Sequence, residues 1–107
     1  MDSTSRCKVK AHTMDINTLS GKIVIVLNND ISPLEFTDWY EEWFYTQVKR
    51  EEHESIFTLL EDFYSDLPYY VAKPEVRAEH PSYFGDEVLI EKIMDLKQKI
   101  NEWLQAR

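Results

Sequence analysis

The sequence predicts an all-α protein, a four-helix bundle with a long aromatic-rich loop before its last helix. Its 107 residues include only two glycines and four prolines, too few for the many tight turns of a β-sandwich or barrel. Several stretches repeat apolar residues at three- and four-residue spacing, which gathers them on one side of a helix. With 43% hydrophobic residues, the chain can bury one core, so we expect residues 14–107 to form a single domain.

Residues 1–13 show no apolar periodicity and no helix cap, so we interpret them as a dispensable N-terminal tail. Residues 15–28 fit two structures. The β-branched run from Lys22 to Leu27 is typical of a strand, whereas a stripe at helical spacing favours a helix: Ile16, Leu19, Ile23, Val26 and Leu27. The length of the stripe and Asp15 as an N-cap favour the helix.

The best-marked helix is the second, over Ser32 to Val48. Ser32 is a good N-cap, Pro33 suits the first helical position, and Glu35 can bond back to the amide of the cap. The aromatic residues that follow recur on one side, which must be buried: Phe36, Trp39, Tyr40, Trp43 and Phe44. We therefore expect Trp39 or Trp43 in the core.

A break is predicted in the charged stretch Lys49 to Glu54. In one continuous helix, the stripe before this stretch and the stripe after it (Ile56, Leu59, Leu60, Phe63) would face roughly opposite ways. A helical hairpin lets both meet one core. The third helix should end near Ser65 or Asp66, because Pro68 cannot continue it.

Residues 67–85 contain three prolines and Gly85 and predict a long loop. Such a loop either serves a function, often as a mobile segment, or is a connector whose aromatic side chains cover the core; those side chains are Tyr69, Tyr70, Tyr83 and Phe84. Asp86 is the predicted cap of the last helix. A seam of Leu89, Ile93, Leu96, Ile100 and Trp103 then predicts packing into the bundle, with Asp95 and Lys99 as a surface pair.

The charge distribution is uneven. The formal net charge is −8, and residues 1–13 are basic, so residues 14–107 carry −10. The segment from Asp30 to Asp66 contains eleven acidic residues and only two basic ones, Lys49 and Arg50. This balance argues against binding nucleic acid or an anionic membrane directly and favours a basic protein partner. The chain has neither a long apolar run nor an apolar leader, so we expect a cytoplasmic protein.

No catalytic or cofactor motif is present. The three histidines lie apart, Cys7 is alone, and no Gly-rich phosphate loop or Cys-x-x-Cys occurs. The carboxylate-to-histidine spacing of di-metal bundles is missing. We therefore expect that the protein binds no metal or cofactor and has no enzymatic activity. A small hydrolase that uses the paired acids Glu61 and Asp62 is the enzymatic alternative.

One family pattern is present over about residues 15–102. A short first helix precedes Asn29-Asp30-Ile31-Ser32, with Glu35 and Phe36 opening the second helix; a third carries Ile56, Leu60, Glu61, Asp62 and Phe63, and a Leu89-to-Ile100 helix closes the chain. This arrangement resembles the colicin D immunity family. The resemblance implies a bacterial, cytoplasmic four-helix bundle that neutralises a cognate nuclease, in that family one that cuts tRNA.

The resemblance matches Glu61 and Asp62 to the acidic pair of the family's third helix, and we expect them to contact the toxin first. Asp66 follows them, and helical geometry adds Glu41 and Glu42 on the second helix. The free protein is expected to be a monomer. The alternative to immunity is an acidic adaptor or DNA mimic that binds another basic protein, such as a repressor or a phage-defence factor.

Overall fold

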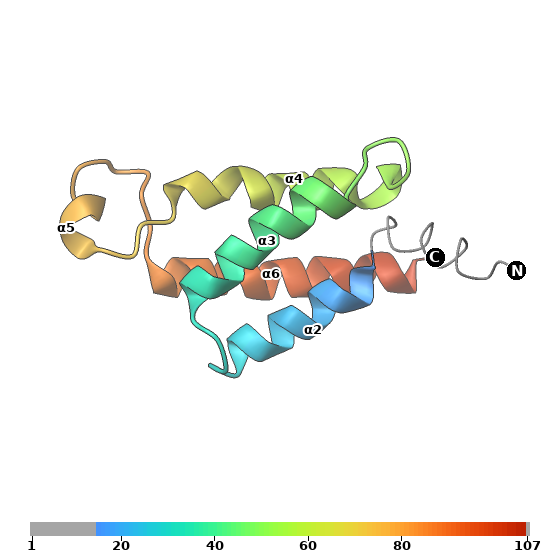
Figure 1. Ribbon diagram of the computed structural model, residues 1–107, viewed down its shortest axis with the longest axis horizontal. Helices are drawn as coiled ribbons and strands as arrows, with labels where there is room; N and C mark the ends of the chain where they lie inside the picture. The colour runs from blue at the N-terminus through green and yellow to red at the C-terminus, as the bar shows by residue number, and fades with distance from the viewer. Residues whose placement is uncertain (1–14, 107) are drawn as a thin grey trace, which may run out of the picture.

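The computed structural model describes residues 15–106; the tail predicted over residues 1–13 lies outside them. Four longer helices form an all-α bundle, which confirms the predicted fold class: α2 (Ile16–Leu27), α3 (Pro33–Gln47), α4 (Glu54–Asp66) and α6 (Asp86–Gln105). Successive long helices run in alternating directions (Figure 1). Two short helices, η1 (Leu67–Tyr69) and α5 (Pro74–Arg77), interrupt the connection between α4 and α6.

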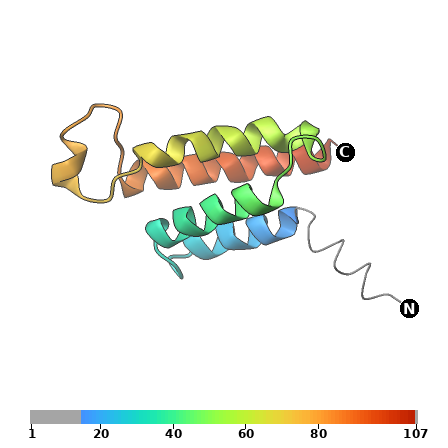
Figure 2. The ribbon, with the colours of Figure 1, turned by 45° about the horizontal axis from the view of Figure 1, so that its top comes forward.

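The four long helices form two layers. Figure 2 shows α2 beside α3 in one layer and α4 beside α6 in the other. Contacts between α2 and α6 and between α3 and α4 join the layers. Each layer is therefore an antiparallel pair, and each pair has one outward face.

The predicted starts of α2 and α3 are confirmed. Oδ1 of Asp15 accepts a hydrogen bond from the Asn17 amide at 3.0 Å, which satisfies a donor that the helix itself leaves free. At α3, Oγ of Ser32 accepts from the Glu35 amide at 3.1 Å and the Glu35 carboxylate accepts from the Ser32 amide at 3.0 Å. Local chemistry thus fixes where both helices begin.

The prediction that Asp86 caps the last helix is wrong. Gly85 is the N-cap of α6, Asp86 is its first residue, and no side chain bonds to the helix start. The Asp86 carboxylate instead accepts a hydrogen bond from the hydroxyl of Tyr70, with 2.6 Å between the oxygens. A tertiary partner therefore replaces the local capping interaction.

The predicted break between the second and third helices is confirmed. α3 ends at Gln47 and α4 begins at Glu54. In the connection, the amide of His53 donates to the carbonyl of Lys49 at 2.9 Å. The turn lets the stripes of α3 and α4 face each other, as the half-turn offset in their phase requires.

One hydrophobic cluster fills the bundle, and the aromatic residues of α3 lie at its centre. Tyr40 and Phe63 meet edge to face with ring centroids 4.8 Å apart, a favourable arrangement of two aromatic rings. Trp43 is buried at 6% exposure. Trp39 is half-buried and stacks on Trp43 at 5.5 Å, so Trp43 is the core tryptophan.

The loop before α6 closes on itself at a neck. The Val71 amide donates to the Phe84 carbonyl at 2.8 Å, and the Phe84 amide donates to the Tyr69 carbonyl at 2.9 Å. Tyr70 and Phe84 pack against the core, as the connector interpretation predicts. Tyr69, which is 44% exposed, and Tyr83 are not among the side chains that pack against the core.

The guanidinium of Arg77 ties the tip of the loop to its neck. Nη1 donates to the carbonyls of Val71 and Ala72 at 2.8 and 3.1 Å. Gly85 leaves room for this group, because a Cβ atom there would overlap it. The short helix α5 is therefore held over the end of the bundle, where Figure 1 shows it.

Candidate partner-binding groove between α4 and α6

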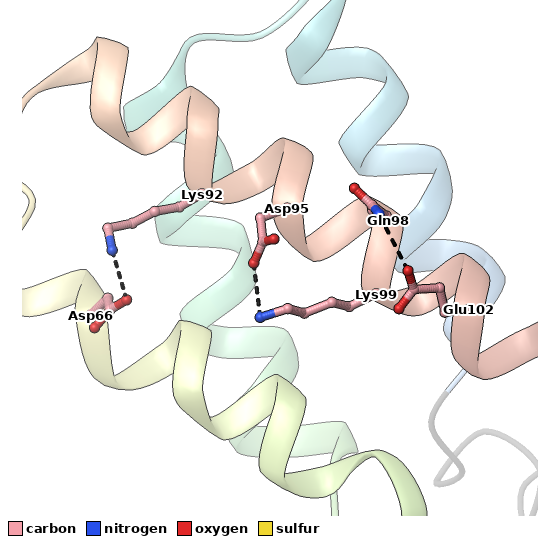
Figure 3. Close-up of polar contacts among 6 residues, drawn as sticks. All are labelled: Asp66, Lys92, Asp95, Gln98, Lys99 and Glu102. Carbon is pink, nitrogen blue, oxygen red and sulfur yellow. Dashed lines mark hydrogen bonds and ion pairs between the residues drawn. The ribbon is translucent and has the colours of Figure 1, made fainter.

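A groove of about 340 Å³ runs between α4 and α6. Figure 3 looks onto it, with α2 and α3 behind, so the groove lies on the outward face of the α4–α6 layer. Ten residues line it: Leu59, Asp62, Phe63, Asp66, Val88, Glu91, Lys92, Asp95, Leu96 and Lys99. Both helices contribute apolar and charged side chains.

The floor of the groove is apolar. Phe63 and Leu96 belong to the buried core, and Leu59 packs against it. Val88 is 40% exposed, which leaves an aliphatic surface open at the end of the groove near the start of α6. A partner side chain that covered this surface would gain free energy from removing it from water.

Four carboxylates surround this floor: Asp62 and Asp66 from α4, and Glu91 and Asp95 from α6. Two are engaged by lysines of the same groove, with Nζ of Lys92 3.1 Å from Oδ2 of Asp66 and Nζ of Lys99 2.9 Å from Oδ2 of Asp95 (Figure 3). Within residues 15–106, no hydrogen bond or ion pair holds the carboxylates of Asp62 and Glu91. The groove therefore keeps a negative charge that a cationic partner can meet.

The two lysines are held differently. Lys92 joins α6 to α4, and its ammonium group also lies 5.2 Å from the centre of the Phe84 ring, close enough for a cation–π attraction. Lys99 pairs with Asp95 one turn away on the same helix. Its pKa is raised by the hydrogen bond to Asp95 and the charge of that carboxylate, and further by the charges of Asp62 and Glu102.

The structure separates Glu61 from Asp62. Glu61 does not line the groove; its Oε2 lies 4.0 Å from Nη2 of Arg50. It shares a face of α4 with Phe57 and Tyr64, whose rings pack on Phe44 of α3. Consecutive helical residues point about 100° apart, so Glu61 and Asp62 lie on different sides of α4.

The other residues predicted to contact the toxin also lie on different surfaces. Asp66 joins Asp62 in the groove. Glu41 and Glu42 are exposed on α3, in the other layer of the bundle, and do not line the groove. The five residues predicted from the sequence thus occupy at least two separate surfaces.

Sequence reasoning missed Glu91 and Asp95 as groove residues. It assigned α6 to packing and read Asp95 with Lys99 as a surface pair, and the pair is confirmed at 2.9 Å. Glu91 and Asp95 are four residues apart, a spacing that places both on one helix face. That signal identifies the face but not the helix beside it, which depends on tertiary packing.

The groove places exposed charged side chains around an apolar floor. Asp62, Glu91 and Asp95 are exposed and Asp66 is half-buried. No group of three or more His, Cys, Asp or Glu side chains between residues 15 and 106 is placed to hold a metal ion. In the same range, no helix has the length and apolar character needed to cross a bilayer.

Comparison of the chain with family models, curated proteins and solved structures finds no match.

Proposed function

We propose that this chain is an immunity protein that neutralises a nuclease toxin by placing the α4–α6 groove against the toxin's basic active site. The observation that carries the proposal is the convergence of four carboxylates from two helices on one apolar-floored groove. The likeness to the colicin D immunity family, noted from the sequence, adds a tRNA-cleaving toxin and the bacterial cytoplasm to the proposal.

The chemistry of nucleases supports this partner. An enzyme that cleaves RNA must hold phosphates with Lys, Arg and His side chains, so its cleft is positive. A domain that carries −10 over residues 14–107 is steered toward such a cleft by long-range electrostatic attraction. Carboxylates on a rigid helix pair can then occupy positions that phosphates would take.

The test is an RNA-cleavage assay with a purified nuclease encoded beside the gene for this protein. The groove variant is Asp62→Lys with Glu91→Lys, because neither carboxylate is engaged in an ion pair within the described chain. We expect wild type to protect the RNA and this variant to lose protection, since like charges would face the basic cleft. Circular dichroism checks that the variant keeps its helices.

The matched control is Glu75→Lys with Glu79→Lys. Both residues are exposed, neither lines the groove, and the net charge changes by the same amount. We expect this variant to protect almost as well as wild type. Equal loss in both variants would mean that total charge, and not the groove, inhibits the nuclease.

A third variant, Glu41→Lys with Glu42→Lys, asks whether the acidic surface of α3 belongs to the interface. Reversing Glu91 with Asp95 cannot serve as a control, because both residues line the groove beside Asp62. If wild type protects against no neighbouring nuclease, the immunity proposal fails. Recovery of a DNA-binding protein in a pull-down would then favour the acidic adaptor.

A further inference from the structure

We propose that the groove binds an arginine side chain of the partner between Asp62 and Asp95, and that Lys99 occupies this position in the free protein and is displaced on binding. The inference deepens the proposed function and rests on it for the identity of the partner. Lys99 would thus be an internal competitor of the partner.

The position of Lys99 marks where the groove attracts a cation. Its ammonium group lies 2.9 Å from Oδ2 of Asp95, and the charge of Asp62, on the facing helix, also stabilises it. Asp62 itself accepts no hydrogen bond and makes no ion pair within residues 15–106. Asp62, Asp95 and Lys99 line the same groove, so carboxylates from two helices surround the site of one exposed ammonium group.

Lys99 is also easy to displace. The side chains of Lys99 and Asp95 are 54% and 59% exposed, and exposed pairs one helical turn apart are stabilised by only about 0.3–0.5 kcal/mol. Lys92 provides the contrast, because its side chain is 35% exposed and bridges both helices while lying over Phe84. The groove thus has one ion pair that links its two helices and one more exposed pair within α6.

The geometry points to arginine with an apolar neighbour. A partner lysine would exchange one ammonium group for another at Asp95 and gain little. A guanidinium presents several donors in a planar fork and can bond two carboxylates at once. The open aliphatic surface of Val88 and the packed side chain of Leu59 can receive the neighbouring apolar side chain.

The test is an NMR titration with the capped dipeptide acetyl-Leu-Arg-amide, followed through the methyl groups of Leu59, Val88 and Leu96. The variant is Lys99→Met, and the control with the same charge change is Lys97→Met. Lys97 is exposed and lines a different depression, with Leu27 and Met94 on the side of α6 that faces α2. Removing an exposed pair that is formed about two-thirds of the time should tighten binding about threefold, whereas Lys97→Met should change it much less.

Three further arms sharpen the result. Acetyl-Leu-Lys-amide should bind more weakly than the arginine peptide, and acetyl-Leu-citrulline-amide, which lacks the charge, should not saturate. Asp62→Asn should weaken binding of the arginine peptide. Equal affinities for Lys99→Met and Lys97→Met, or methyl shifts that do not saturate in the groove, would overturn the inference.

The outcome separates this inference from the proposed function. Saturable binding with the predicted order of variants, but no protection against a nuclease, would retain the groove site and remove the nuclease as its partner. Protection by wild type with no effect of Lys99→Met on the peptide would retain the immunity function and remove Lys99 as a competitor.

Discussion

The hydroxyl of Tyr40 in α3 donates a hydrogen bond to the backbone carbonyl of Leu60 in α4, with 2.8 Å between the two oxygens. The tyrosine is fully buried, and burial raises its pKa far above the usual value of 10.0. The folded protein therefore keeps this side chain neutral at a pH where the unfolded chain ionises it. Because the folded pKa is raised, the stability linked to this group is present below pH 10 and lost as the pH rises further.

Tyr40→Phe should show this dependence directly. At pH 8 the variant should be less stable by about 1 kcal/mol, since it lacks the hydroxyl and its hydrogen bond. Between pH 8 and pH 11, ionisation of the unfolded wild type should reduce its stability by about 1.4 kcal/mol more than that of the variant. Urea unfolding at both pH values measures the difference in the free energy of unfolding between wild type and variant. A difference that does not change with pH would contradict a raised pKa for Tyr40.

The two stacked tryptophans should differ in their contribution to stability. Trp43→Ala should lower the free energy of unfolding by about 3–5 kcal/mol, because it leaves a cavity in the core. Trp39→Ala should cost clearly less, since Trp39 is only half-buried. Chemical denaturation of both variants checks the order, and equal losses would place both indoles in the core.

The two glycines should respond to alanine with opposite signs. Gly21 lies within α2 and a Cβ atom there meets nothing within 4 Å, so Gly21→Ala should stabilise the protein by about 0.5–1 kcal/mol. At Gly85, the Cβ atom would displace the Arg77 guanidinium from its two carbonyl partners, and alanine is a poorer N-cap than glycine. Gly85→Ala should therefore destabilise by about 1 kcal/mol.

Thermal unfolding measures the change in both glycine variants. Amide hydrogen exchange at Val71 and Phe84 should rise only in Gly85→Ala, because those amides form the neck. Unchanged exchange there would show that Arg77 does not hold the loop.

Association with the proposed nuclease should slow as salt is added. The Debye length falls from about 10 Å at 0.1 M to about 3 Å at 1 M, which screens attraction between the acidic domain and a basic cleft. Stopped-flow association rates should fall steeply for wild type and less steeply for Asp62→Lys with Glu91→Lys. The control is Glu75→Lys with Glu79→Lys. If the association rates of both double variants depend on salt concentration in the same way, a local effect of the groove is excluded.

The helix ends that depend on local chemistry could be predicted from the sequence. The Ser32 and Glu35 bonds and the Asp15 cap follow from residues within three positions of each other. The break after α3 follows from the phase of the two apolar stripes on either side of it. Asp86 failed as a cap because its partner, Tyr70, is sixteen residues away. The short helices η1 and α5 lie in a proline-containing loop, where periodicity gives no signal.

The groove could be predicted only in part. Asp62 and Asp66 were identified, and their four-residue spacing agrees with one shared face. The same geometry places Glu61 on another side of α4, outside the groove, because neighbouring residues on a helix point about 100° apart. Glu91 and Asp95 could not be paired with α4 from the sequence, since their own helix shows which face they share but not which helix packs beside it.

The neck of the loop has a consequence for how this protein can change over evolutionary time. The backbone hydrogen bond between Val71 and Phe84 holds the two ends of the loop together. The distance between the end of α4 and the start of α6 therefore does not depend on the residues between them. Doubling the length of a flexible loop costs only about 0.6 kcal/mol of closure entropy. If Arg77 keeps its bonds to the neck, the other residues of 72–83 can therefore change in length and sequence while α4 and α6 keep their register, so the tip can diversify among descendants that share one groove.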